Sequence, residues 1–168
     1  MKVEFDVTMT AGKIYDYLLK HAMSTKQGFF TELGGLILMV IYFFTGNLIL
    51  FCLGALAMLY FPLTLYFNAT KQIKNVPYFA NKIHYIVSDS GIAIIAGDQK
   101  QFQPWKRMYK VMSTTKSIIV YTDEVNACIL PKEDMGDKRP AVIQFITTYM
   151  PKNKVNLEKM DTIRKSRA

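Results

Sequence analysis

The chain has 168 residues, of which 51% are hydrophobic, and a formal net charge of +8 at pH 7. Between residues 29 and 67 the sole acidic or basic residue is Glu32, whereas all 21 Lys and Arg residues lie outside that stretch. This separation indicates bilayer and water, and it argues against a soluble protein with a buried hairpin. A cleaved secretory signal is also disfavoured, because residues 1–28 precede the apolar stretch.

Residues 1–28 are predicted to form a strand and then an amphipathic helix. The polar and apolar side chains alternate over residues 2–8, a pattern typical of a half-buried strand. Because one strand is not stable alone, we expect it to join the cytoplasmic sheet. Thr10 can cap the following helix, in which Ile14 and Leu18 recur at helical spacing. That helix is expected to lie either against the bilayer or on the cytoplasmic sheet.

Residues 29–67 are predicted to form a transmembrane helical hairpin. The first apolar run has about 17 residues and the second, 48–67, has about 20, which reaches roughly 30 Å as a helix. Residues 45–47, Thr-Gly-Asn, form the turn between them, so the two helices must run antiparallel. Lys residues flank the hairpin and none lies in the turn, which predicts that both termini are cytoplasmic. Residues 68–81 follow as a juxtamembrane helix or linker.

Residues 82–150 are predicted to form a cytoplasmic β domain closed by a helix over 140–150. The residue pattern changes here from helical to extended, with turn residues at short intervals. Pro140 suits the first turn of the helix, where the N–H that it lacks would have no partner. Residues 151–168 are expected to be a loose basic tail. Strands are expected at Ile83 to Ser88, Ile92 to Ile95, Gln101 to Trp105, Arg107 to Ser113, Ser117 to Tyr121 and Ala127 to Leu130.

No spacing in the sequence indicates a catalytic or metal site. The two histidines, His21 and His84, and the two cysteines, Cys52 and Cys128, form no ligand cluster. The glycines belong to no phosphate-binding loop, and no nucleophile with a neighbouring base can be recognised. We therefore expect no catalytic residue, no metal, no cofactor and no enzymatic activity.

The clearest polar feature is positive charge between residues 67 and 116, where eight Lys and Arg residues are opposed by Asp89 and Asp98 alone. Near an anionic inner leaflet each basic residue contributes on the order of 1 kcal/mol to binding. The alternative is a solvated basic surface, and nucleic acid is not expected because there is no aromatic stacking motif. The candidate contacts to lipid head groups or a protein partner are Lys106, Arg107, Lys110 and Lys116. If they lay on one alternating strand, Lys106 and Lys110 would share a face and Arg107 would not.

The order of these parts resembles the YcxB-like family of bacterial membrane proteins. The resemblance is carried by Val-Ser-Asp-Ser-Gly-Ile at 87–92, Pro-Trp at 104–105, Ser-Ile-Ile-Val-Tyr at 117–121 and Ile-Leu-Pro-Lys at 129–132. It implies an α+β membrane protein whose cytoplasmic domain is similar to bacterial pleckstrin-homology-like domains, with a bent antiparallel sheet and a C-terminal helix. It implies no activity, so no catalytic residue is carried over.

The expected function is that of a membrane-anchored, non-enzymatic interaction or regulatory module at the inner face of a bacterial plasma membrane. Its expected partners are the lipid bilayer and either a protein or anionic lipid head groups, and it could also form a homo-oligomer. The alternative is an oligomeric small transport or pore-forming subunit, which would need a role for Glu32.

Overall fold

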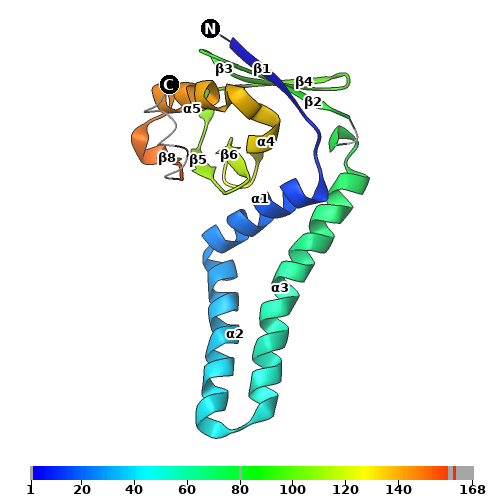
Figure 1. Ribbon diagram of the computed structural model, residues 1–168, viewed down its shortest axis with the longest axis vertical. Helices are drawn as coiled ribbons and strands as arrows, with labels where there is room; N and C mark the ends of the chain where they lie inside the picture. Colours follow the sequence, from blue (N-terminus) through cyan, green and yellow to red (C-terminus); the bar gives the residue numbers. More distant parts are fainter. Residues whose placement is uncertain (1, 80, 159–160, 162–168) are drawn as a thin grey trace.

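The computed structural model describes residues 2–79, 81–158 and 161 and has an α+β architecture in two parts (Figure 1). Two long helices, α2 (Lys26–Thr45) and α3 (Leu48–Asn75), form a stalk. Two β-sheets and the remaining helices form a head at the end of the stalk where α2 begins and α3 ends.

The two stalk helices are antiparallel neighbours that approach each other closely. Gly46 joins them with φ +69°, a left-handed conformation that favours glycine. The Asn47 side chain then caps α3 by accepting a 3.0 Å hydrogen bond from the backbone N–H of Ile49. A Cβ atom added to Gly54 would lie 2.6 Å from the carbonyl oxygen of Gly35. The turn is where the sequence predicts it, and small residues let the hairpin pack against itself.

One helix of the stalk meets the length and composition of a membrane span by itself. That helix is α3, which continues to Asn75, so most of the expected linker at 68–81 is helical. The helix α1 (Ala11–Ser24) and residues 29–45 meet the same criteria only as a pair bent by 78°. By length and composition, the described residues thus contain one possible membrane span, or two if the bent pair forms a second span.

Helix α1 lies between the stalk and the second sheet of the head. It begins after Thr10, whose Oγ1 accepts a 3.3 Å hydrogen bond from the backbone N–H of Lys13. Ile14 is buried, and the Tyr17 hydroxyl donates a 2.6 Å hydrogen bond to the carbonyl of Val125. Of the two expected placements of this helix, packing on the sheet is the one observed.

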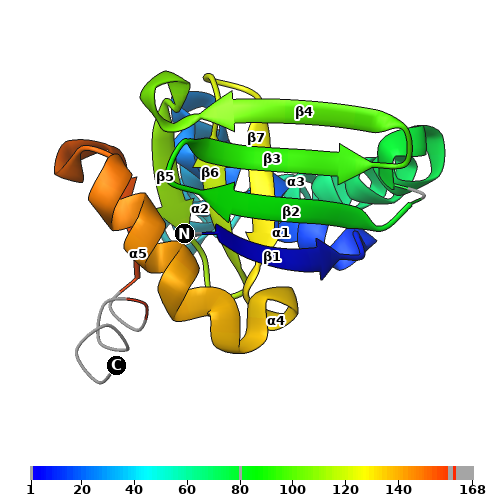
Figure 2. The same ribbon diagram turned by 90° about the horizontal axis from the view of Figure 1, so that it is seen from above.

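The head contains two sheets whose strands cross at a steep angle (Figure 2). The first sheet has four antiparallel strands in the spatial order β1 (Lys2–Val7), β2 (Ile83–Ser88), β3 (Gly91–Ala96) and β4 (Gln99–Pro104). The second has the order β7 (Ala127–Pro131), β6 (Ser117–Tyr121), β5 (Lys110–Ser113) and β8 (Val155–Asn156), and β8 alone is parallel to its neighbour. Strand β1 is separated from β2 by the whole stalk, so the stalk is an insertion within the head.

The core lies between the two sheets, and α5 (Arg139–Tyr149) closes one end of it. The helix predicted over 140–150 is observed as α5, and its side chains Val142, Phe145 and Ile146 are buried while Tyr149 at its end is exposed. Trp105 is 4% exposed, and its indole N–H donates a 2.8 Å hydrogen bond to the carbonyl of Ser88. The single tryptophan is therefore part of the core.

Two predicted segments differ from the structure. The chain between the sheets is not a pair of strands over 101–113: β4 ends at Pro104, Trp105–Arg107 forms a 3₁₀ turn (η2), and β5 begins only at Lys110. The turn is required because the indole of Trp105 must reach the core as the chain passes from one sheet to the other.

The predicted tail is also partly structured. Lys152–Lys154 forms a 3₁₀ turn (η4), and Val155–Asn156 then pairs with β5. Val155 packs against the core, so the free energy of apolar burial holds this short strand in place. The rest of the predicted tail, residues 159–160 and 162–168, lies outside the described residues.

Candidate functional site

The four predicted contact residues do not share one strand face. Lys106 and Arg107 are exposed on η2, whereas Lys116 is exposed in the connection after β5. Lys110 is half-buried at the start of β5, and its ammonium nitrogen lies 4.7 Å from the ring centroid of Tyr121. The expectation that Lys106 and Lys110 share a strand face is wrong, because Lys106 lies in a 3₁₀ turn.

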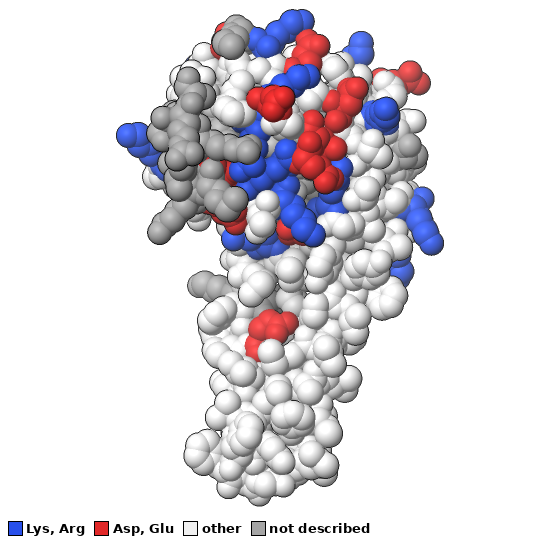
Figure 3. All heavy atoms as spheres, viewed as in Figure 1, with Lys and Arg blue, Asp and Glu red and all other residues white. Residues whose placement is uncertain are grey.

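Most charged side chains lie on the head (Figure 3). On the face drawn, basic and acidic groups intermingle over the head, and the stalk shows a single acidic patch. The sequence has one acidic residue between 29 and 67, Glu32, and its side chain is half-buried. The distribution of charge thus follows the division between stalk and head.

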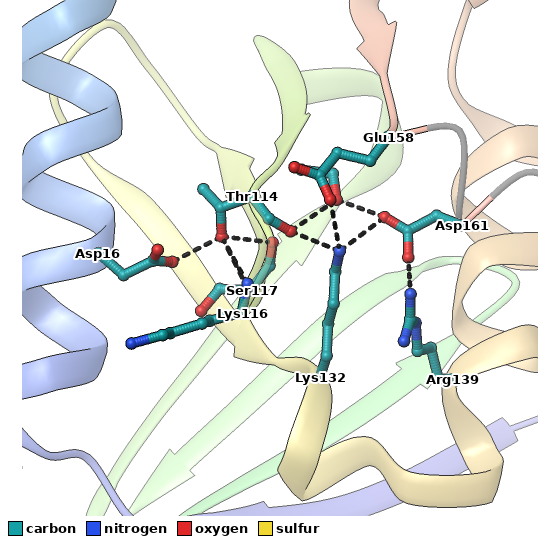
Figure 4. Close-up of polar contacts among 9 residues, drawn as sticks. Asp16, Thr114, Lys116, Ser117, Lys132, Arg139, Glu158 and Asp161 are labelled. Atoms are coloured by element: carbon teal, nitrogen blue, oxygen red, sulfur yellow. Dashed lines mark hydrogen bonds and ion pairs between the residues drawn. The ribbon is translucent and has the colours of Figure 1, made fainter.

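A buried network of charged side chains ties the end of the described chain to the head (Figure 4). The ammonium of Lys132 lies 2.8 Å from a carboxylate oxygen of the fully buried Asp161 and also donates to the carbonyl of Thr114. Asp161 accepts further hydrogen bonds from Arg139 and Ser113. Burial raises the pKa of Asp161, but these three side chains lower it by more, so the pKa lies below its ordinary value. Each group is held by the others, so the network has a structural role.

The larger open hollow lies between the sheets and measures about 500 Å³. One wall is β4, where Gln101 and Gln103 lie opposite Ile94 and Ile92 of β3 and so share their face. Gln99 occupies the same face, so three glutamines replace the aliphatic side chains that a core-facing strand normally carries. We call this space the inter-sheet hollow.

A second hollow of about 320 Å³ lies on the other side of β7, against α1. Ile14, Tyr17, Leu18 and His21 line it from the helix. The His21 ring stacks against both Tyr17 and Tyr121, with centroid distances of 5.8 Å and 5.9 Å, and the two tyrosine rings lie 6.1 Å apart. Burial lowers the pKa of His21, and the charge of Lys110 lowers it further. We call this space the helix-side hollow.

Two ionisable side chains of the inter-sheet hollow, Cys128 and Tyr78, are shifted by burial toward their protonated forms. Burial raises the pKa of the Cys128 thiol to about 12, so the thiol stays protonated at neutral pH. Burial also raises the pKa of Tyr78 to about 12. Among the described residues there is no group of three or more His, Cys, Asp or Glu side chains placed to hold a metal ion.

The sequence contains a pattern that indicates the inter-sheet hollow, but it consists of uncharged residues and so does not appear in the distribution of charge. Gln99, Gln101 and Gln103 stand at alternate positions, which places three amides on one strand face. The buried network had no such signal, because Lys132, Arg139 and Asp161 come from separate segments with no common period. The contacts were predicted in the Lys106 to Lys116 segment because its positive charge can be read from the sequence alone.

Comparison with known proteins finds a similarity to one family in part of the head. The family model described as YcxB-like protein matches residues 87–146, which run from the end of β2 into α5. No curated protein and no solved structure matches the chain. The match confirms the resemblance to the YcxB-like family over residues 87–146, which contain η2, three strands of the second sheet and most of α5.

Proposed function

We propose that this chain is a membrane-anchored, non-enzymatic module that holds a protein partner at the inner face of a bacterial plasma membrane. The carrying observation is the exposure of the stalk: Phe43, Phe44 and Ile49 are 76%, 86% and 67% exposed, and most of the exposed large apolar side chains lie between residues 29 and 67. So large an apolar surface marks contact with a membrane or another protein. The length of the stalk helices favours the membrane.

In this proposal the stalk inserts as two antiparallel spans with both chain ends in the cytoplasm. Exposed aromatic side chains, Phe29 and Phe30 on α2 and Tyr66 on α3, stand where the stalk meets the head, as in an interfacial belt. Lys71 and Lys74 follow on the last turns of α3 and are exposed. Their position beyond the apolar run supports a cytoplasmic head.

The head is proposed to be a pleckstrin-homology-like domain. Support comes from the first sheet of four antiparallel strands, the three antiparallel strands of the second sheet, and α5 closing one end. The stalk leaves this domain after β1 and α1 and returns before β2. Two connections hold the domain more rigidly than one linker would, so its height and tilt above the bilayer would be fixed.

A protein partner is favoured over anionic lipid as the ligand of the head. The described residues that line the two hollows include no Lys or Arg. Lys106 and Arg107 lie before β5 and Lys116 after it, so the predicted basic contacts have no common strand. Anchoring needs no lipid recognition by the head when the stalk itself is embedded.

The test combines membrane extraction with site-specific photocrosslinking of the full chain in native membranes. The protein is expected to remain in the membrane in alkaline carbonate and to leave it in detergent. A photoreactive residue at Gln101, inside the inter-sheet hollow, is expected to capture a protein. The matched control is the same residue at Phe102, which is 52% exposed and lies on the opposite face of β4.

Three results would contradict the proposal. Release by carbonate alone would remove the membrane anchor. Capture of lipid at Gln101 would replace the protein partner with lipid. Crosslinks between copies through stalk positions such as Leu56, with none through the head, would favour the oligomeric pore and direct attention to Glu32.

A further inference from the structure

Strand β7 has a free edge. It is the terminal strand of the second sheet in the described part of the chain, with β6 on its one paired side. The backbone N–H of Thr122 donates a 2.9 Å hydrogen bond to the carbonyl of Asn126, and that of Lys132 donates a 2.8 Å bond to the carbonyl of Lys116. In an antiparallel pair, successive residues of a strand direct their backbone N–H and C=O groups alternately toward the neighbouring strand and away from it. Residues 126, 128, 130 and 132 thus face β6, while residues 127 and 129 direct their backbone groups outward.

The two hollows lie on opposite faces of this strand. Ala127 and Ile129 lie opposite Tyr121 and Ile119, on the face that α1 covers, whereas Cys128 points toward the inter-sheet core. Ala127 and Ile129 line both hollows, so the hollows meet at the free edge. The side chains of a strand paired to β7 would alternate between the same two faces.

We propose that the β7 edge accepts an extended peptide segment of a partner protein as an added strand, with its side chains entering the two hollows in turn. This inference rests on the proposed function, because it names the partner chemistry of that head. β7 has five residues, so the segment pairs over about five residues, or about 17 Å. Backbone hydrogen bonds supply affinity, and the hollows supply specificity.

The linings define the chemistry of the segment. Three glutamines and Asp123 face the inter-sheet hollow. Backbone and side-chain hydrogen bonds from Asn126 and the backbone N–H of Val125 lower the pKa of Asp123, so it is ionised at neutral pH. Side chains entering here are uncharged and polar, or basic. The helix-side hollow has polar groups in His21 and Gln72, but Ile14, Leu18 and Phe79 give it apolar walls that suit apolar side chains. The segment alternates polar and apolar residues and contains no acid.

The probe is a display library of ten-residue peptides in which apolar positions (Val, Ile, Leu or Phe) alternate with polar ones (Ser, Thr, Gln or Lys). The library is screened on the full chain in detergent micelles, and the enriched peptide is measured by fluorescence anisotropy. Ala127→Pro removes one outward N–H without touching the β6 pairing, and Pro is tolerated at such an edge. Ala127→Ser keeps the N–H and is the matched control.

The expected result is enrichment of binders whose affinity falls about tenfold in Ala127→Pro and stays within about twofold in Ala127→Ser. N-methylation at alternate backbone nitrogens of the peptide, which leaves the protein unchanged, is expected to abolish binding. The backbone amides of Ala127 and Ile129 are expected to exchange slowly with solvent only when the peptide is bound.

Failure to enrich any peptide would overturn the inference, as would a binder insensitive to both N-methylation and Ala127→Pro. Displacement of the peptide by phosphatidylglycerol vesicles would reassign the hollows to lipid. These failures are separable from failure of the proposed function. A protein captured in native membranes at Lys116 instead of Gln101 would preserve the partner-binding module and place its contact elsewhere.

Discussion

At the scale of single residues, Asp161 shows how a buried charge depends on its partners. Its carboxylate is fully buried and contacts Lys132, Arg139 and Ser113 at once. The contacts join α4 (Lys132–Met135), the start of α5 and the end of β5. Removing the carboxylate would leave two cations poorly compensated in the interior, and the cost of such a loss exceeds the net value of the ion pair.

Asp161→Asn is therefore expected to lower the free energy of unfolding by about 3–5 kcal/mol. Denaturant titration of the full chain in detergent measures it, because the sole tryptophan, Trp105, reports on the core. Glu124→Gln, in an exposed turn, is the control and is expected to change little. A loss below about 1 kcal/mol in Asp161→Asn would mean that the network is not a stabilising unit.

The same carboxylate predicts a pH dependence. Its folded pKa lies below its unfolded value, so its contribution is complete above the unfolded pKa of about 3.9 and is lost as the pH falls through the folded pKa. The wild-type protein is expected to lose stability more steeply than Asp161→Asn below about pH 4. Parallel acid profiles for the two proteins would contradict this assignment.

Cys128 gives a residue-scale prediction about reactivity. With a pKa near 12, roughly one thiol in ten thousand is ionised at pH 8, and thiolate is the reactive form. Alkylation by iodoacetamide, followed by mass spectrometry, is expected to leave Cys128 unmodified in the folded protein and to modify it fully after denaturation. Equal rates in both states would show that the thiol is accessible and not desolvated.

At the scale of elements, the close approach of α2 and α3 leaves no space for a side chain at Gly54 but leaves space at Gly34. A Cβ at Gly54 would meet the carbonyl oxygen of Gly35, whereas a Cβ at Gly34 would meet nothing within 4 Å. Gly54→Ala is expected to force the helices apart and destabilise the hairpin by about 1–3 kcal/mol. Gly34→Ala is expected to be neutral or stabilising by up to about 1 kcal/mol, because alanine favours helix.

Spin labels at Ile37 and Leu53, both exposed on the stalk, measure the outcome as a distance between the helices. Gly54→Ala is expected to lengthen and broaden that distance, and Gly34→Ala to leave it unchanged. If both variants behave alike, the two helices do not rely on this close approach.

The elements also show what a sequence can predict. The stalk, its turn, and β2, β3, β6 and β7 follow from runs and alternation of at least four residues. Strand β8 has two residues and exists because Val155 reaches the core beside β5, which no local period reveals. The extent of η2 likewise depends on where Trp105 must point. Tertiary contacts determine these segments, so the local sequence pattern does not predict them.

At the scale of the whole molecule, the stalk divides the head in sequence but not in space. β1 and α1 precede it, β2 follows it, and β1 pairs with β2 along its full length. The head can form only when both ends of the stalk return to the same side. In the proposed orientation the turn lies outside the cell and the head inside it. Because the two are joined by the stalk, the side on which one lies determines the side on which the other lies.

This choice can be tested with a membrane-impermeant maleimide in a background where Cys52 and Cys128 are replaced by Ser. Thr45→Cys, in the exposed turn of the stalk, is expected to be labelled in intact cells. Glu124→Cys, in the exposed β6–β7 turn, is expected to be labelled only after the membrane is permeabilised. The reverse pattern would invert the orientation, and labelling of both sites in intact cells would mean that the stalk does not span the bilayer. The two sites are both exposed in the folded chain, so a difference in labelling reports the side of the membrane and not local burial.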